Sequence, residues 1–322
     1  MEKRRLGKTD IEITPIGLGS WQFSQGAKGM SRIWDNIGQE AITGIVDTAL
    51  KGGISWFDTA ELYGRGTSEQ TLAAALSALG VQPGSVVVAT KWWPFPRTAR
   101  SISATIDTRL SRLSPYPIDL YQIHQPISFS PIPAQMREMV KLLRAGKIAS
   151  IGVSNFSAKQ MEIAHAALAA EGIVLASNQV RFNLLDRGIE RNGILEKAKK
   201  LGVTIIAWSP LAQGVLTGRY HEDPSLLNKV PLMRRMMGRL SPTALERTRP
   251  LVNEMRSIAR AHGASIAQVA LSWEVSFHGQ TVVAIPGATR STQAEQNAEA
   301  MKVQLSETER SALDALSRTA GG

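Results

Sequence analysis

The fold is decided by the stretch Ile54-Ser55-Trp56-Phe57-Asp58-Thr59-Ala60-Glu61-Leu62-Tyr63-Gly64. An apolar run from Ile54 to Phe57 ends abruptly in Asp58, and Tyr63 follows five residues later beside a glycine. This pattern predicts a buried strand that ends in a loop, with Asp58 at the carboxyl end of the strand and Tyr63 above it. In a barrel of alternating strands and helices, catalytic groups lie at the carboxyl ends of the strands. Tyr63 is therefore either a packing residue or a proton donor.

The same unit, an apolar strand followed by a helix, recurs along the chain. We expect eight strands, at residues 16–20, 54–57, 85–90, 118–122, 149–153, 174–179, 203–208 and 281–285. Short, continuously apolar strands are typical of a parallel sheet that is covered on both faces. Eight of them predict a single (β/α)₈ TIM barrel domain over residues 1–322, with an N-terminal hairpin and a long loop after the seventh strand, at residues 211–240.

A doubly wound nucleotide-binding sheet is the competing fold. Its glycine-rich fingerprint is incomplete here, because Gly64-Arg65-Gly66 is followed by no third glycine at the required spacing. No linker or break in composition indicates a second domain. The barrel is therefore the prediction.

Composition excludes several kinds of chemistry. The chain has no cysteine, which excludes disulfides, thiolate nucleophiles and cysteine-ligated metals. Its five histidines show no paired helical spacing, so we expect no metal site. No apolar run approaches the roughly 18 residues that span a bilayer, and no hydrophobic segment follows the basic N-terminus. We therefore expect a cytoplasmic protein without a membrane partner.

The formal net charge of +10 has three interpretations. It reflects a solvated basic surface, a site for an anionic small molecule such as a phosphorylated cofactor, or a nucleic-acid interface. The basic residues are dispersed except at residues 3–5 and 234–249, so we expect no nucleic-acid partner. The sequence leaves open whether the chain is a monomer or a homo-oligomer.

Three ionisable residues stand at consecutive strand ends. Asp58 ends the second predicted strand, Lys91 follows the third, and His124 follows the fourth. Singly, they are as readily explained as a helix cap, a surface charge and a core histidine. Together with Tyr63, they are the set that a proton-donating tyrosine needs.

The chemistry of this set depends on the acidity of Tyr63. A free tyrosine has a pKa near 10 and is a reluctant acid. A lysine ammonium about 3 Å away, at an effective dielectric near 20, favours the phenolate by roughly 5 kcal/mol. We therefore predict that Lys91 lowers the pKa of Tyr63 by about two to three units. Asp58 keeps Lys91 charged, and His124 orients a carbonyl oxygen.

With these residues in place, the whole chain resembles the aldo-keto reductase superfamily, in particular its NADPH-dependent subgroup related to the potassium-channel beta subunits. The resemblance rests on stretches whose order and spacing match: Phe57-Asp58-Thr59-Ala60, Tyr63-Gly64, Thr90-Lys91, Asp119 to His124, Ile151 to Phe156, Asn178-Gln179-Val180, Trp208-Ser209-Pro210-Leu211, Gly214 and Ile285-Pro286-Gly287-Ala288. It implies a TIM barrel that binds NADPH or NADP⁺, with a catalytic tetrad of Asp58, Tyr63, Lys91 and His124.

The resemblance also implies a set of cofactor contacts. Ser154, Asn155 and Gln179 would bind the nicotinamide carboxamide, and Trp208 would stack on its ring where relatives commonly have tyrosine. Ser209, Leu211 and Gly214 would line the pyrophosphate, and residues 287–297 would hold the adenosine end. In that segment, Arg290 would contact the 2′-phosphate that distinguishes NADP from NAD. The full predicted set is Ser20, Trp21, Ser154, Asn155, Gln179, Trp208, Ser209, Leu211, Gly214, Gly287, Arg290, Gln293 and Asn297. Gln296 departs from the family pattern, which has an acid before the final asparagine.

The sequence is less specific about the long loop and about the substrate pocket. The long loop carries Arg219, Arg234, Arg235 and Arg239, and it either folds over the cofactor or is a flexible surface loop. Trp21, Trp92 and Trp93, with Phe95 nearby, are predicted to form an apolar substrate pocket.

The resulting functional prediction is an NADPH-dependent reductase of small-molecule aldehydes or ketones, an enzyme in which Tyr63 supplies the proton. The alternatives are a non-catalytic regulatory subunit of the same fold, and an NAD(P)-dependent dehydrogenase that works mainly in the oxidative direction.

Overall fold

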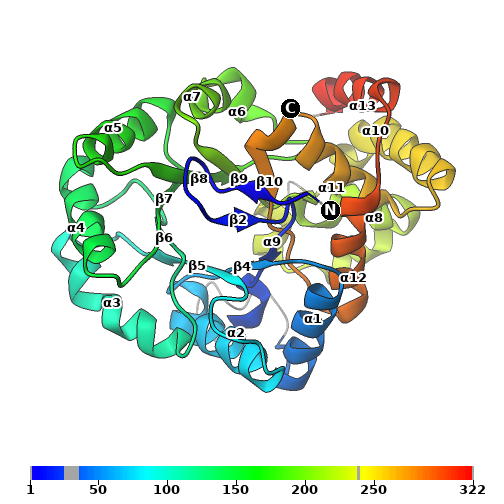
Figure 1. The fold of residues 1–322 in the computed structure, drawn as a ribbon. Helices are drawn as coiled ribbons and strands as arrows, with labels where there is room; N and C mark the ends of the chain where they lie inside the picture. The colour runs from blue at the N-terminus through cyan, green and yellow to red at the C-terminus, as the bar shows by residue number, and fades with distance from the viewer. Residues whose placement is uncertain (1, 25–35, 238–239, 321–322) are drawn as a thin grey trace.

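The computed structural model describes residues 2–24, 36–237 and 240–320 of the chain. Its centre is an eight-stranded parallel sheet in which spatial neighbours follow the order of the chain (Figure 1). The strands are β3 (Leu18–Gly19), β4 (Trp56–Asp58), β5 (Val87–Trp92), β6 (Leu120–Ile123), β7 (Ile151–Ser154), β8 (Leu175–Arg181), β9 (Thr204–Trp208) and β10 (Val282–Ala284).

The sheet closes on itself. Parallel bridges join Ile16 to Ala284 and Gly19 to Gly287. The Gly17 N–H donates to the Ala284 carbonyl at 2.9 Å, and the Ala284 N–H donates to the Pro15 carbonyl at 2.9 Å. The first strand therefore pairs with the last, and the predicted (β/α)₈ barrel is confirmed.

Helices surround this sheet (Figure 1). Helix α1 is representative, because it buries Ile42, Ile45, Val46 and Ala49, which share one face of the helix. The α-helices are α1 (Gln39–Lys51), α2 (Thr67–Ala78), α3 (Arg100–Leu113), α4 (Ile132–Arg144), α5 (Ala158–Ala169), α6 (Gly188–Arg191), α7 (Ile194–Leu201), α8 (Arg219–Glu222), α9 (Leu232–Met237), α10 (Pro242–Ala261), α11 (Ile266–Ser276), α12 (Ser291–Glu299) and α13 (Glu307–Ala320). Short 3₁₀ turns add η1 (Trp21–Ser24), η3 (Tyr63–Gly66), η4 (Ala212–Thr217), η5 (Pro224–Lys229), η6 (Gly279–Thr281) and η7 (Ala300–Lys302).

The predicted N-terminal hairpin closes one end of the barrel. Strands β1 (Arg4–Arg5) and β2 (Glu12–Ile13) pair antiparallel. Leu6 and Ile13 are buried and pack against the inward-facing side chains of the strands. The Gly7 N–H also donates to Thr204 Oγ1 at 2.7 Å, at the start of β9. We call this closed, apolar end the floor of the barrel, and the opposite end, at the carboxyl termini of the strands, the mouth.

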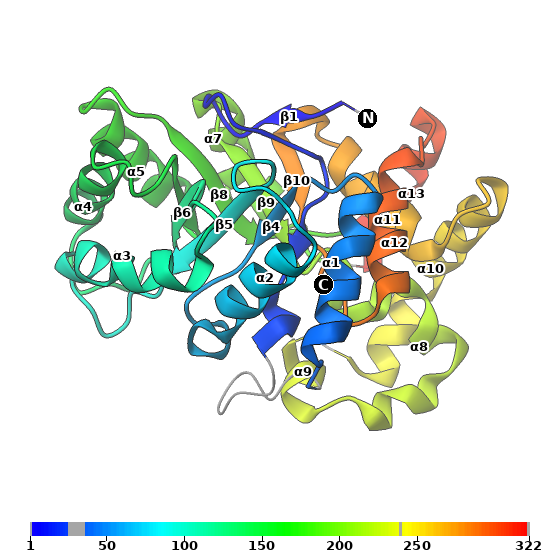
Figure 2. The ribbon, with the colours of Figure 1, turned by 60° about the horizontal axis from the view of Figure 1, so that its bottom comes forward.

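The long segment after β9 is more ordered than a loop. It contains η4, α8, η5 and α9, which lie at the end of the molecule opposite the hairpin (Figure 2). The sequence does not predict these helices, because each has only four or six residues, too few to show a repeating apolar face. Leu216, Tyr220 and Leu227 nevertheless anchor the segment, because they are buried. Arg239 of this segment and residues 25–35, which follow the first strand, lie outside the described residues.

No helix in the described part of the chain combines the length and apolar character needed to cross a bilayer.

Candidate active site

The mouth of the barrel holds a buried ion pair at its centre. The Lys91 ammonium pairs with Asp58 Oδ1, and it donates to the Thr59 carbonyl at 2.8 Å. Its third neighbour is the Tyr63 hydroxyl, whose oxygen lies 3.4 Å from Lys91 Nζ. Both charged side chains are excluded from solvent. Strands β4 and β5 thus place a fixed positive charge under the tyrosine, as the sequence predicts.

Two glutamines hold the other oxygen of Asp58. Gln179 Nε2 donates to Asp58 Oδ2 at 2.8 Å, and Gln122 Nε2 donates to the same oxygen at 3.1 Å. Gln122 is absent from the predicted site, and Gln179 is predicted only as a cofactor contact. The available signal was a polar residue inside the apolar run of β6, on the same face of the strand as His124. With both glutamines present, the carboxylate is satisfied without solvent.

The charges of the tetrad follow from this geometry. Burial alone would lower the pKa of Lys91, but Asp58 and then Tyr63 raise it above its usual value, so the ammonium stays charged. Burial raises the pKa of Tyr63, and the Lys91 ammonium opposes this only in part. The predicted fall in the pKa of Tyr63 is therefore wrong for the chain by itself. Desolvation outweighs the attraction between charges, and Tyr63 is a neutral hydroxyl near pH 7.

His124 completes the tetrad as a neutral imidazole. Burial lowers its pKa well below the usual value, and the Lys91 charge adds to the effect. The His124 ring meets Tyr63 edge-on, with 5.7 Å between ring centroids. Its Nδ1 is buried and has no hydrogen-bond partner among the described residues. The imidazole thus lies against the Tyr63 ring and has unused hydrogen-bonding capacity at Nδ1.

Two tryptophans flank this pair, and a third does not. Trp21 stacks on Tyr63 at 6.0 Å between centroids, and Trp93 meets His124 edge-on at 5.4 Å. Trp92, by contrast, is completely buried and its Nε1 donates to Ser101 Oγ of α3. The burial of Trp92 argues against the predicted substrate contact, which leaves Trp21 and Trp93 as the aromatic walls.

The residues predicted to bind the nicotinamide form one connected group. Ser154 Oγ donates to the Gln179 carbonyl at 2.9 Å, and Asn155 Nδ2 donates to Ser154 Oγ at 3.0 Å. Trp208 Nε1 donates to Asn155 Oδ1 at 3.1 Å. Ser20 lies elsewhere: it is buried, and its hydroxyl donates to the Asp58 carbonyl. Ser20 is therefore not part of the cofactor site proposed below.

The backbone around this group is unusual. Every non-glycine residue with positive φ in the described chain lies in a mouth loop: Arg65, Asn155, Ser209, Ala212 and Gln213. Such conformations are costly, persist only where the surroundings enforce them, and cluster at ligand clamps. The run Ala212-Gln213-Gly214 has φ of 46°, 56° and 97° in succession. A turn of this kind can form a concavity that receives an anion.

Two arginines of the long segment lie against this turn. The Arg219 guanidinium packs beside Gly214, where a Cβ would come within 3.1 Å of Arg219 Nη2. Arg234 Nη2 lies 3.5 Å from the Gln213 carbonyl. The segment thus brings positive charge to the predicted pyrophosphate position. Leu211 and Ser209 lie in the same turn, since Ala212 N–H donates to the Ser209 carbonyl and Gly214 N–H to the Leu211 carbonyl.

The predicted adenosine segment is folded on itself. Gln293 Oε1 accepts hydrogen bonds from the Thr289 N–H at 2.7 Å and its hydroxyl at 3.0 Å. Asn297 is buried, with its Nδ2 3.5 Å from the Gly287 carbonyl. Arg290 precedes α12 and is exposed. The side chains of Gln293 and Asn297 therefore shape the loop from which Arg290 projects.

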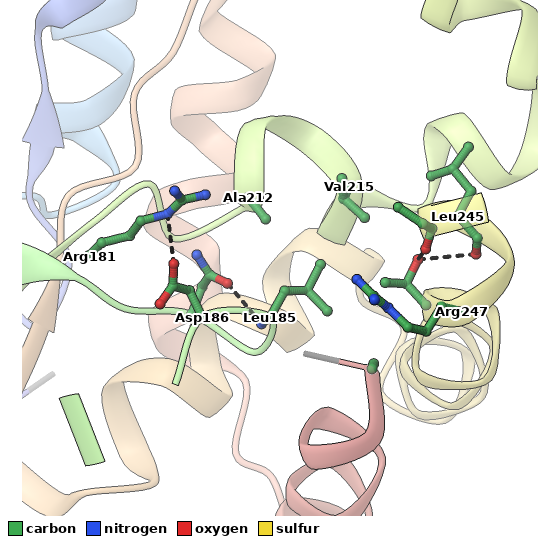
Figure 3. Close-up of a pocket in the computed structure, with 11 residues that line it drawn as sticks. Arg181, Leu185, Asp186, Ala212, Val215, Leu245 and Arg247 are labelled. Atoms are coloured by element: carbon green, nitrogen blue, oxygen red, sulfur yellow. Dashed lines mark hydrogen bonds and ion pairs between the residues drawn. The ribbon is translucent and has the colours of Figure 1, made fainter. Parts of the chain in front are cut away.

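A pocket next to the turn at residues 212–214 does not contain the tetrad. It lies between the end of β8, η4 and the start of α10 (Figure 3). At its edge, Arg181 Nε lies 3.1 Å from Asp186 Oδ2, and the Arg181 guanidinium stacks over the Trp208 ring at 5.6 Å. None of the tetrad residues lines it. The reactive groups lie instead around the carboxyl ends of β4, β5 and β6.

A closed parallel barrel with an aspartate, a tyrosine, a lysine and a histidine at its mouth is the arrangement that defines one class of oxidoreductases. The chain belongs to the aldo/keto reductase family, whose model matches residues 15–318.

Individual relatives agree with this assignment. An uncharacterized oxidoreductase of Mycobacterium tuberculosis is 38% identical over 305 residues, which cover 94% of this chain and 88% of the relative. The chloroplastic pyridoxal reductase of Arabidopsis thaliana is 30% identical over 326 residues, with 97% and 85% covered. A Klebsiella pneumoniae aldo/keto reductase solved with NADP and acetate matches with a TM-score of 0.75 at 26% identity, covering 100% of this chain and 97% of that one.

Proposed function

We propose that this chain is an NADPH-dependent carbonyl reductase in which Tyr63 donates a proton to the carbonyl oxygen of an aldehyde or ketone. The observation that carries the proposal is the position of Lys91, whose ammonium is tied to Asp58 and lies 3.4 Å from the Tyr63 hydroxyl. A general acid must hold its proton until the transition state and then release it easily. Tyr63 meets both needs.

The first need is met by burial, which raises the pKa of Tyr63 and keeps the hydroxyl protonated. The second is met by Lys91, because its charge stabilises the phenolate that forms as the proton leaves. Asp58, Gln122 and Gln179 fix the ammonium in place. Neutral His124 is suited to hydrogen-bond the carbonyl oxygen without adding a charge that would repel Lys91.

The residues around the mouth fit a dinucleotide cofactor, which supplies a hydride when bound. Support comes from the left-handed turn at residues 212–214 and from Arg219 and Arg234 beside it. We propose that Ser154, Asn155, Gln179 and Trp208 hold the nicotinamide. Ser209, Leu211 and Gly214 would hold the pyrophosphate. The adenosine end would lie against Gly287, Gln293 and Asn297, with Arg290 on the 2′-phosphate, because a guanidinium fork suits a phosphate dianion.

The aromatic walls favour carbonyl compounds with an apolar or aromatic body. Trp21 and Trp93 border the Tyr63–His124 pair on its two sides. A relative named pyridoxal reductase suggests a heteroaromatic aldehyde as one member of a substrate panel.

The test is Tyr63→Phe, assayed with NADPH and a panel of aliphatic and aromatic aldehydes. We expect NADPH to bind near normally by tryptophan fluorescence, with NADPH preferred to NADH, while kcat falls by about 10²–10⁴-fold. Wild-type turnover by Tyr63→Phe would contradict the mechanism. A wild-type chain that binds NADPH but turns over no aldehyde would favour a regulatory subunit, and faster NADP⁺ reduction by alcohols would favour a dehydrogenase.

A further inference from the structure

A second group of charged and polar residues, most of them buried, lies directly beside the tetrad. It consists of Glu61, Glu69, Arg97, Arg109 and Thr90, which we call the Glu61 cluster. Its members come from the loop after β4, from α2, from the end of β5, from the loop that follows β5 and from α3. None of them belongs to the reacting set proposed above, yet both carboxylates are buried.

Glu61 joins two loops of the mouth. Its Oε1 accepts from the Trp93 N–H at 2.5 Å and from Arg97 Nη1 at 2.6 Å. Its Oε2 pairs with Arg109 Nη1. The Glu61 N–H in turn lies 3.3 Å from the Lys91 carbonyl. The loop that carries Tyr63 is thus fastened to the segment that follows Lys91.

Arg109 extends this connection to the strand. Its Nε lies 3.0 Å from Glu69 Oε2, a close ion pair rather than an aligned hydrogen bond. Glu69 Oε1 accepts from the Thr90 hydroxyl at 2.7 Å. Burial raises the pKa of Glu69 to about 7 against the opposing charges of Arg109 and Arg112. The cluster therefore holds β5 immediately before Lys91.

The arrangement brackets the Lys91–Tyr63 contact from both sides. Thr90 and Trp93 stand on either side of Lys91 in the chain, and Glu61 precedes Tyr63 by two residues. The 3.4 Å between Lys91 Nζ and Tyr63 Oη is at the outer limit of a hydrogen bond. A small shift of either loop would break this contact.

We propose that Glu61 and Arg109 are positioning residues that hold the Tyr63 loop against the Lys91 strand, and so keep the Tyr63 hydroxyl within reach of the Lys91 ammonium. This inference rests on the proposed role of Tyr63 as proton donor. Neither residue touches the reacting atoms; both act through the backbone segments they join.

The test is Glu61→Gln, which keeps the shape of the side chain and removes its charge. We expect kcat to fall about 10–100-fold, as misplacement of a reacting group predicts, with the KM for aldehyde and the Kd for NADPH within about 2-fold of wild type. Loss of the ammonium contact destabilises the phenolate. The pKa of Tyr63 should therefore rise, and the alkaline limb of the kcat profile should move to higher pH. A second variant, Arg109→Lys, keeps the positive charge but loses the guanidinium group that contacts both Glu61 and Glu69. Its kcat should therefore lie between those of the wild type and Glu61→Gln.

The matched control is Arg187→Gln. Arg187 is equally buried and pairs with Glu190 at 2.6 Å and Asp314 at 2.7 Å. Those partners do not touch the tetrad, so we expect a loss of stability with kcat and the pH profile unchanged. If Glu61→Gln behaves like Arg187→Gln, the cluster is structural only and the inference is overturned.

A direct titration separates this inference from the proposed function. Phenolate absorbance of the cofactor-free protein, taken as the difference from Tyr63→Phe, reports the Tyr63 pKa without any turnover. A higher pKa in Glu61→Gln and, to a smaller extent, in Arg109→Lys supports the inference even if no aldehyde is reduced. An unchanged pKa in both variants overturns it even if the enzyme is an active reductase.

Discussion

The two ends of this barrel are built from the same strands but bury opposite kinds of side chain. At the mouth, the buried side chains include Asp58, Lys91 and His124, which form a charged and hydrogen-bonded group. At the floor, Leu6 and Ile13 of the hairpin pack on apolar residues of the strands. Burying charged groups destabilises the folded state, whereas burying apolar surface stabilises it. The comparison indicates that the floor stabilises a fold whose mouth is free to carry reactive groups.

The largest effect is expected from a substitution that removes the buried ion pair at the mouth. Lys91→Met leaves Asp58 as a buried carboxylate without a counter-ion, which should destabilise the fold by about 3–5 kcal/mol. It should also lower kcat by about 10²–10⁴-fold, because the phenolate of Tyr63 loses its stabilising charge. Urea unfolding and steady-state NADPH oxidation measure the two effects.

The double variant Asp58→Asn with Lys91→Met is the control for this prediction. Removing both charges should restore most of the stability, since a buried ion pair contributes little net stability over uncharged side chains. Activity should remain lost. Recovery of turnover in the double variant would show that the ion pair is structural.

The next largest effect is expected from a substitution in the apolar packing of the floor. Leu6→Ala removes a buried side chain and should cost about 2–5 kcal/mol of unfolding free energy. The kcat should stay within about 2-fold of wild type below the lowered Tm, because the cavity lies at the end opposite the tetrad. Leu6→Met, which conserves volume, should cost less than about 1.5 kcal/mol. A large fall in kcat at full folding would mean that the two ends are coupled.

The smallest effect on stability is expected from a buried glutamate that belongs neither to the tetrad nor to the floor. Glu274 lies on α11, is buried, and neither carboxylate oxygen has a hydrogen-bond partner among the described residues. Burial raises its pKa well above the usual value. An acid with a raised folded-state pKa is most stabilising below its unfolded pKa, near 4.3, and stability is lost as the pH rises toward the folded value.

Glu274→Gln should therefore be more stable than wild type at pH 7, with a difference that shrinks as the pH falls toward 4.3. The slope expected in that window is at most about 1.4 kcal/mol per pH unit. Because Glu69 is present in both proteins, its own titration cancels from the difference. A pH-independent difference would mean that Glu274 is charged in the folded protein.

Much of the fold and the tetrad could be predicted from the sequence. Strand residues such as Val87 and Val88 form apolar runs at regular intervals, and polar residues at their ends stand out. The error at Trp92 has a specific cause: β5 continues to Trp92, beyond the predicted end at residue 90. Because alternate residues of a strand face opposite sides, Trp92 turns to α3 while Lys91 faces the barrel interior.

Interactions between distant residues were harder to predict. Gln122 stands out as a polar residue in an apolar run, but no local pattern identifies Asp58 as its partner, because Gln122 and Gln179 meet at Asp58 only where three strands converge. The direction of the pKa shift of Tyr63 also depends on how deeply the mouth is buried, a quantity that the sequence does not give. The same holds for the Glu61 cluster, which joins residues of α2, α3, β5 and the loops that follow β4 and β5.

Closure of the barrel between Ile16 and Ala284 has a consequence for synthesis on the ribosome. The whole tetrad lies before residue 125, so all four reactive side chains are made when less than half of the chain exists. The strand that completes the sheet comes last, and pairing such distant segments is slow. We expect the nascent chain to hold its full set of reactive groups without activity until β10 emerges and the first strand finds its partner.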